Sequence, residues 1–257
     1  MQSKNLFGLR RLVVCGCLLI GAQAVQAGLS PVDRNAEVQQ IRSLSYSVVV
    51  NALLYYNQNG SPYEQDNARV GKQSLERLLE LTGRDFPGPV HSCAEQLAQA
   101  VQELRHLPQS AAEVRSVSVP YSPWLPHVVE LQARLDGLLS QRPDTANQAS
   151  SMRAVSHDIE RLLLSYEIAS FANLGADIWI LDDRTMAQLD ASIVERLTGL
   201  SSQYPDLVSV QRDYQFVRRD LLNPTGHWTP TGVNRYLARA VSALNSRAES
   251  LNRPSGA

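Results

Sequence analysis

Five histidines and three cysteines are the side chains of this 257-residue chain best suited to metal binding or nucleophilic chemistry. The histidines are scattered, and the closest pairing is His91 with Cys93, two positions apart. Two positions on an α-helix correspond to a rotation of about 200°, so this imidazole and this thiol do not converge on one ion. The histidine and cysteine spacings typical of zinc sites are missing as well. We therefore expect no metal and no cofactor.

Cys93 lies on an apolar stripe with Leu97, Val101 and Leu104. A cysteine at such a position is more typical of a small buried hydrophobic residue than of a reactive nucleophile. The alternative is a thiol that links two copies of the chain through a disulfide.

Motifs of covalent catalysis are also missing. The chain has no Gly-x-Ser-x-Gly elbow and no glycine loop that could cradle a phosphate. His157-Asp158 with Glu160 is typical of a solvated, acidic helix surface, and Asp182-Asp183 is typical of a helix start, where carboxylates favour the positive end of the helix dipole. We expect the protein not to be an enzyme. A hydrolase, the alternative, would require a cleft that joins His157 or His227 to a carboxylate.

The elements that must position these residues are helices. Apolar residues recur at three- and four-residue intervals, and the alternation of β-strands is nearly absent. Residues typical of helix starts, such as Ser61-Pro62 and Thr229-Pro230, and of helix ends, such as Asn59-Gly60, divide this apolar pattern into segments. Eight helical segments result, with apolar stripes over residues 38–55, 75–79, 93–104, 125–138, 155–171, 186–197, 210–221 and 233–244. The sequence predicts an all-α fold.

Short matches between the two halves indicate an internal duplication. Leu44-Ser45-Tyr46 recurs as Leu164-Ser165-Tyr166, and Phe86-Pro87 recurs as Tyr204-Pro205. Two further matches keep the same order in both halves, and the number of residues that separates the matched segments decreases slowly along the chain. We predict two tandem up-and-down four-helix bundles, over residues 28–144 and 145–257. The alternative is one elongated helical bundle in which both halves share a core.

Residues 1–27 have the pattern of a signal peptide. A basic start that includes Arg10 and Arg11 precedes an apolar run at residues 12–20, and the small-residue sequence Val25-Gln26-Ala27 follows. Cleavage after Ala27 would send the protein to the periplasm, with secretion as the alternative. It would also remove Cys15 and Cys17 and leave Cys93 as the one cysteine of the mature chain.

Net charge and hydropathy limit the classes of binding partner that we expect for the protein. Removing Lys4, Arg10 and Arg11 lowers the 24 basic side chains to 21 against 25 acidic ones, a net charge of −4. A mildly acidic protein lacks the electrostatic signature of nucleic-acid binding or of a basic face for anionic lipid. No later stretch approaches about 20 apolar residues, so we expect no stable membrane insertion of the mature chain.

The run Arg42-Ser43-Leu44-Ser45, with the helix–turn–helix predicted over residues 36–83, resembles a bacterial sensor family. This is the periplasmic helical-bundle sensor domain of type IV pilus chemotaxis transducers and nitrate/nitrite sensors. The family's fuller Arg-Gln-Arg-Met run, its transmembrane helices and its signalling module are missing. The resemblance implies that Arg42 matches an arginine that faces an anion or a partner helix. The pattern of the residues themselves predicts a solvated or interhelical charge there.

Together these patterns predict an exported, non-catalytic helical-bundle protein that binds a small-molecule ligand or an envelope protein, with Arg42 as the candidate ligand-binding residue. The alternative is a structural or assembly adaptor for an envelope machine such as a pilus or a secretion system. The sequence leaves the ligand, the partner and the oligomeric state open.

Overall fold

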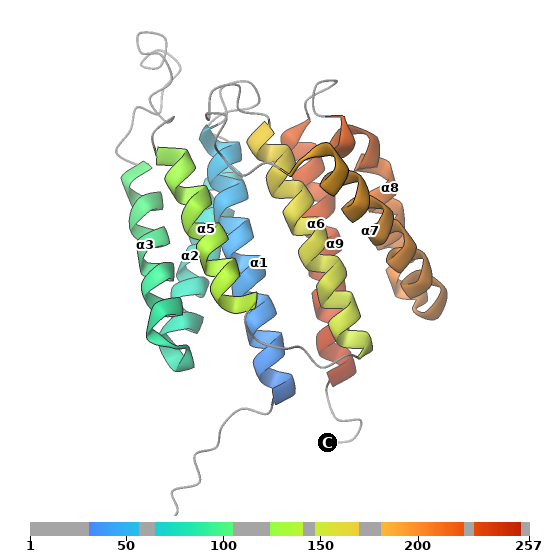
Figure 1. Ribbon diagram of the computed structural model, residues 1–257, viewed down its shortest axis with the longest axis horizontal. Helices are drawn as coiled ribbons and strands as arrows, with labels where there is room; N and C mark the ends of the chain where they lie inside the picture. Colours follow the sequence, from blue (N-terminus) through green and yellow to red (C-terminus); the bar gives the residue numbers. More distant parts are fainter. Residues whose placement is uncertain are drawn as a thin grey trace, which may run out of the picture.

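The structure of the protein, a computed structural model, describes most of the chain in six stretches: 31–56, 65–104, 124–140, 147–169, 181–223 and 229–252. Within these stretches the fold is all-α, as the sequence predicts, and no strand occurs (Figure 1). The α-helices are α1 Pro31–Tyr56, α2 Gln65–Asp85, α3 Gly88–Leu104, α5 Trp124–Ser140, α6 Gln148–Ala169, α7 Asp183–Gln203, α8 Val208–Leu222 and α9 Pro230–Asn252. A 3-10 helix, η1 at Pro205–Leu207, directly precedes α8.

Several sequence predictions lie outside the described residues. These are the signal peptide of residues 1–27, the turn signals at Asn59-Gly60 and Ser61-Pro62, and the boundary between the two predicted units near residue 145. In the part of the chain that is described, no helix combines the length and the apolar character needed to cross a bilayer.

The α-helices of the described stretches pack as two sets of four that lie side by side (Figure 1). In the first set α1, α2, α3 and α5 form a ring in which each helix contacts the next, and α6, α7, α8 and α9 form a second ring. The two sets meet where α1 packs against α6 and α9. Buried apolar residues of both sets form one continuous core. The internal duplication stays a prediction, although Phe86-Pro87 and Tyr204-Pro205 both lie between the second and third helices of their sets.

The closest pairing in the first set is that of α1 with α2, and small residues allow it. The position where a Cβ atom would stand on Gly71 is only 3.3 Å from the Cβ atom of Asn51. One turn away, the hydroxyls of Ser47 and Ser74 form a hydrogen bond of 2.8 Å between the two helices. A larger side chain at Gly71 would therefore force α2 away from α1.

Helix α6 is buried around its whole circumference along residues 162–168, because it packs against α1, α7, α8 and α9. Seven consecutive residues correspond to about two turns, so this part of the helix has no solvent-facing side. The stretch includes the carboxyl side chain of Glu167, which is fully buried. Burial raises the pKa of Glu167 well above its usual value.

Two predicted helix starts in the second set are confirmed. The side chain of Asp182 accepts a hydrogen bond of 2.6 Å from the backbone N–H of Thr185, which is an N-cap of α7. Pro230 is the first residue of α9, where its missing N–H is tolerated. The backbone oxygen of Thr229 accepts the N–H of Val233, which closes the first turn. These caps fix where the two helices begin.

Candidate functional site

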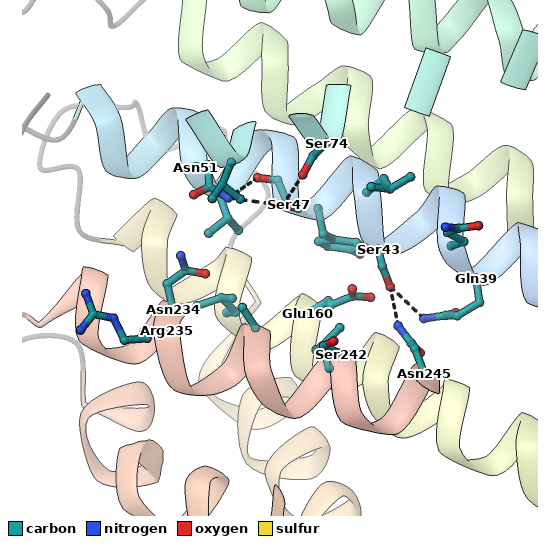
Figure 2. Close-up of a pocket in the computed structure, with 18 of the residues that line it drawn as sticks. Gln39, Ser43, Ser47, Asn51, Ser74, Glu160, Asn234, Arg235, Ser242 and Asn245 are labelled. Atoms are coloured by element: carbon teal, nitrogen blue, oxygen red, sulfur yellow. Dashed lines mark hydrogen bonds between the residues drawn. The ribbon is translucent and has the colours of Figure 1, made fainter. Parts of the chain in front are cut away.

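A cavity of about 650 Å³ lies between α1, α2, α6 and α9, at the place where the two sets of helices meet (Figure 2). Its volume falls in the range of small-molecule sites, roughly 300–1,000 Å³. Cavities of this kind are frequent between the helices of bundles. The cavity is therefore the first place to look for function.

Most of the polar side chains that line the cavity are uncharged amides and hydroxyls. Four of them, Gln39, Ser43, Ser47 and Asn51, repeat every four residues along α1, so they form one row on the same face of the helix (Figure 2). The other helices add further side chains of the same chemical kind: Asn67, Ser74, Thr231, Asn234, Ser242, Asn245 and Ser246. The lining offers many hydrogen-bonding groups from three helices.

Ser43 connects α1 and α9 in the wall of the cavity. Its Oγ atom accepts a hydrogen bond of 3.3 Å from Nε2 of Gln39 and one of 3.0 Å from Nδ2 of Asn245. Residues 43 and 245 are 202 positions apart, so this contact depends on how the two sets of helices meet. Each of the two amide groups uses one of its N–H donors within the wall of the cavity.

Glu160 brings the one buried carboxyl group to the cavity. Its side chain reaches from α6 to the space between Ser43 on α1 and Ser242 on α9 (Figure 2). Only 5% of the residue is exposed, and Oε2 has no hydrogen-bond partner among the described residues. The prediction of a solvated acidic surface at this position is wrong, because α1 and α9 cover this side of α6.

The carboxyl group of Glu160 is neutral at neutral pH. Burial raises its pKa to about 8, because a carboxylate loses its hydration when it leaves water. The hydrogen bond from Ser43 and the charge of Arg42 oppose this effect, while the charge of Asp136 adds to it. The cavity therefore holds a proton that a suitable ligand could displace.

Arg42, the candidate residue from the sequence, lies beside this cavity in an ion-pair network. Its Nε atom donates to Oδ1 of Asp136 at 2.6 Å, and its terminal nitrogen donates to Oγ of Ser140 at 2.9 Å. His157 Nε2 lies 3.1 Å from Oδ2 of Asp136 and 3.5 Å from the hydroxyl of Tyr46. The network connects α1, α5 and α6. The interhelical charge expected at Arg42 is thus observed, and its role in ligand binding stays a prediction.

Electrostatics in this network favour a charged Asp136 and a neutral Tyr46. Burial alone would raise the pKa of Asp136, but the hydrogen bonds and charges of His157 and Arg42 outweigh burial and lower it below its usual value. Burial raises the pKa of the Tyr46 hydroxyl far above its usual value, and the charge of Asp136 adds to the effect. Arg42 and His157 also line a second, smaller cavity of about 450 Å³.

The network brings together a histidine and a carboxylate, the pairing that a hydrolase would need. In the described part of the chain, the hydroxyl that contacts His157 is that of Tyr46, whose raised pKa makes it a poor nucleophile. The hydroxyl of Ser140 instead donates to the backbone oxygen of Asp136. His227 lies outside the described residues. The geometry is that of a structural ion-pair network, and catalysis remains an untested alternative.

The remaining candidates from the sequence lie apart from both cavities. Cys93 is buried, as predicted, and its thiol lies 3.5 Å from the backbone oxygen of Leu131 on α5. His91 faces α2 instead, where Nδ1 lies 3.3 Å from the hydroxyl of Thr82. Within the described stretches, no three histidine, cysteine, aspartate or glutamate side chains gather so that they could hold a metal ion.

Comparisons of the chain with protein-family models, with curated proteins and with solved structures find no match. The protein is therefore classified by its fold and its candidate site. It is an all-α bundle protein with a polar cavity between its two sets of helices.

Sequence reasoning missed the cavity, although part of its signal is visible in the sequence. The row of Gln39, Ser43, Ser47 and Asn51 has helical spacing, but an isolated helix with such a row would present it to solvent. The row becomes the wall of a cavity only because α9, encoded about 200 residues later, packs opposite.

Proposed function

We propose that the protein binds a small polar ligand in the cavity between α1, α2, α6 and α9. The observation that carries this proposal is the buried carboxyl group of Glu160, which opens into a cavity lined by amides and hydroxyls. Convergent polar groups in a pocket of this volume are typical of ligand sites.

The energetics of the lining support this proposal. A polar group that is buried without a partner lowers the stability of a protein by about 1–3 kcal/mol. Apolar residues at the same helix positions would extend the core instead. Residues that reduce stability in this way are expected mainly at functional sites. A bound ligand would supply the missing hydrogen bonds to Oε2 of Glu160 and Oδ1 of Asn245.

The test is a thermal-shift screen of small cationic, neutral and anionic polar compounds, followed by calorimetry of the hits. In the variant Ser242→Phe, a large ring would fill part of the cavity from α9, so binding should be lost. Ser250 is also an exposed serine of α9 but does not line the cavity, so Ser250→Phe is the matched control and should bind normally. A screen without any hit, or equal binding by both variants, would count against the proposal.

The other functional predictions from the sequence stay proposals. Export to the periplasm is supported by the signal-like pattern of residues 1–27, and the sensor-like role is supported by the resemblance around Arg42. For the envelope adaptor, the discriminating measurement is crosslinking of cells followed by purification of the protein. A stoichiometric protein partner would favour the adaptor, and a monomer with a ligand in the cavity would favour the binding protein.

A further inference from the structure

We propose that the ligand carries a cationic group with N–H donors, an ammonium or a guanidinium, which Glu160 and Asn245 bind beside Ser43 in the cavity. This inference rests on the proposed function, since it names the class of ligand for the same cavity.

The hydrogen bonds around Ser43 leave two buried oxygen atoms without a partner among the described residues. Gln39 and Asn245 both donate their amide N–H groups to Oγ of Ser43. The hydroxyl of Ser43, in turn, donates to the carboxyl group of Glu160. Among the described residues, Oε2 of Glu160 and Oδ1 of Asn245 have no hydrogen-bond partner, and both atoms are buried. Oδ1 of Asn245 is an acceptor, and Oε2 of Glu160 becomes one when its carboxyl group loses its proton.

Two buried acceptors favour some ligand groups and disfavour others. An ammonium has three N–H donors and a guanidinium has five, so either can satisfy both acceptors at once. A carboxylate or phosphate would place further acceptors against them, at the cost of a desolvated charge. A neutral hydroxyl offers only one donor, and a quaternary ammonium offers none. The geometry thus favours a cation that bears N–H groups.

Binding of one cation leaves the net charge around the cavity unchanged if Glu160 loses its proton at the same time, because the charged groups there sum to one positive charge while Glu160 is protonated and to zero once it ionises. Charged groups that line the cavity or act on Glu160 come from all the helices around it: Arg42 on α1, Asp66 and Arg69 on α2, Asp136 on α5, Arg153 on α6, and Arg235 and Glu249 on α9. Asp66 and Arg69 form an exposed ion pair with each other, and Asp136 pairs with Arg42. An ionised Glu160 would be the negative partner of the ligand cation.

Binding should then displace a proton. Because burial raises the pKa of Glu160 to about 8, its carboxyl group is protonated at pH 7 in the free protein. A cation within hydrogen-bonding distance favours the carboxylate and lowers that pKa. The O–H bond of Glu160 breaks, the proton passes to the buffer, and the ligand cation remains protonated beside the carboxylate. Near pH 7 we expect roughly one proton released for each ligand bound.

The probes are four compounds with matched carbon chains or matched charge. 1,4-Diaminobutane carries ammonium groups, and agmatine adds a guanidinium. Butane-1,4-diol has the same chain without charge, and butane-1,4-bis(trimethylammonium) has the same chain and the same two charges without N–H donors. Calorimetry at pH 7 in two buffers that differ in ionisation enthalpy measures both the affinity and the proton release. We expect diaminobutane or agmatine to bind at least roughly tenfold more tightly than the diol and the bis(trimethylammonium) compound, since a charge-assisted hydrogen bond contributes about 1.5–3 kcal/mol.

Two variants test whether Glu160 is the source of the released proton. Glu160→Gln keeps the shape of the side chain but has no acidic proton, so proton release should disappear and affinity should fall by about tenfold or more. Glu167→Gln is the matched control, because Glu167 is also a buried carboxyl group of α6 but does not line the cavity. This control should retain the affinity and the proton release of the unmodified protein.

Different failures have different meanings. If a neutral or anionic compound from the wider screen binds and Ser242→Phe abolishes its binding while no amine binds, the inference about the cation is wrong and the proposed function stands. Amine binding without proton release, or equal affinity in Glu160→Gln, also contradicts the inference. If no compound of any class binds, both the inference and the proposed function fail.

Discussion

One carboxylate oxygen of Asp136 on α5 accepts a hydrogen bond of 2.6 Å from Nε of Arg42 on α1. The other oxygen lies 3.1 Å from Nε2 of His157 on α6. A single side chain thus connects helices of both sets. The side chains of Arg42, Asp136 and His157 are all less than one fifth exposed. Ion pairs in such surroundings are weakly screened, and loss of one partner leaves a charge that is poorly hydrated.

Replacement of Asp136 by alanine should strongly destabilise the protein. The variant Asp136→Ala would leave the guanidinium of Arg42 without its carboxylate, and we expect a loss of about 3 kcal/mol in the free energy of unfolding. Urea denaturation at pH 7 measures this loss. Glu76→Ala is the control, because Glu76 forms an exposed ion pair with Lys72 that should contribute less than about 1 kcal/mol. Equal stability of the two variants would show that the network does not hold the sets together.

The contribution of Asp136 should depend on pH in a defined direction. Its pKa in the folded protein is lowered, so its stabilising effect is present above its usual pKa of 3.8 and is lost as the pH falls through the folded value. The difference in unfolding free energy between the unmodified protein and Asp136→Ala should therefore shrink at acid pH. A difference that grows on acidification would contradict this assignment.

Glu160 should have the opposite pH dependence. Its pKa is raised from 4.5 to about 8, so its favourable contribution is complete below pH 4.5 and is lost as the pH rises through about 8. The variant Glu160→Gln cannot ionise and should be more stable than the unmodified protein at pH 8.5, by roughly 2–5 kcal/mol, with little difference at pH 4.5. Urea denaturation at the two pH values provides the test. The same pH dependence in both proteins would place Glu160 in water.

Asp190 links α7 to α8, and its replacement should destabilise the protein about as strongly as the replacement of Asp136. Arg218 donates to both of its carboxylate oxygens, at 2.8 and 2.6 Å, and the hydroxyl of Tyr214 donates to Oδ1 at 2.9 Å. Asp190→Ala would leave the buried Tyr214 hydroxyl without a partner, with an expected loss of about 2–4 kcal/mol. Arg218→Lys should cost less, because lysine keeps the charge but not the two parallel hydrogen bonds. Thermal denaturation of both variants should give this order, and the reverse order would be contrary to the geometry.

Cys93 should react slowly with thiol reagents. Only 1% of the residue is exposed, and burial raises the pKa of its thiol, so the reactive thiolate is both scarce and covered. Mass spectrometry of the peptide that contains Cys93 can follow its alkylation in native protein and in urea. We expect labelling to be at least about a hundredfold faster in urea. Comparable rates would mean that this face of α3 is open to solvent.

The sequence was sufficient for the fold because local signals determine the helices. The cap at Asp182, the start at Thr229-Pro230 and the apolar stripe around Cys93 each act within a few residues, and the structure confirms each of them. Packing between helices then follows the general rule that apolar stripes are buried.

The candidate site could not be predicted in the same way, because it depends on contacts between distant parts of the chain. Arg42 and Asp136 are 94 positions apart, and no local pattern pairs them. Glu160 follows His157 and Asp158 in a charged run that is typical of a surface. That interpretation assumes one buried face for each helix, and α6 violates the assumption because α1 and α9 also cover the side that carries Glu160.

The burial of α6 on all sides along residues 162–168 also has a kinetic consequence. Backbone N–H groups over residues 162–168 cannot meet water through a small opening on one side, since every side of the helix is covered by another helix. Their hydrogens should exchange with deuterium only when the whole molecule opens. The exchange rate of α6 would therefore report the global free energy of unfolding, and a ligand that binds anywhere in the folded protein should slow this exchange by the factor 1 + c/Kd, where c is the free ligand concentration.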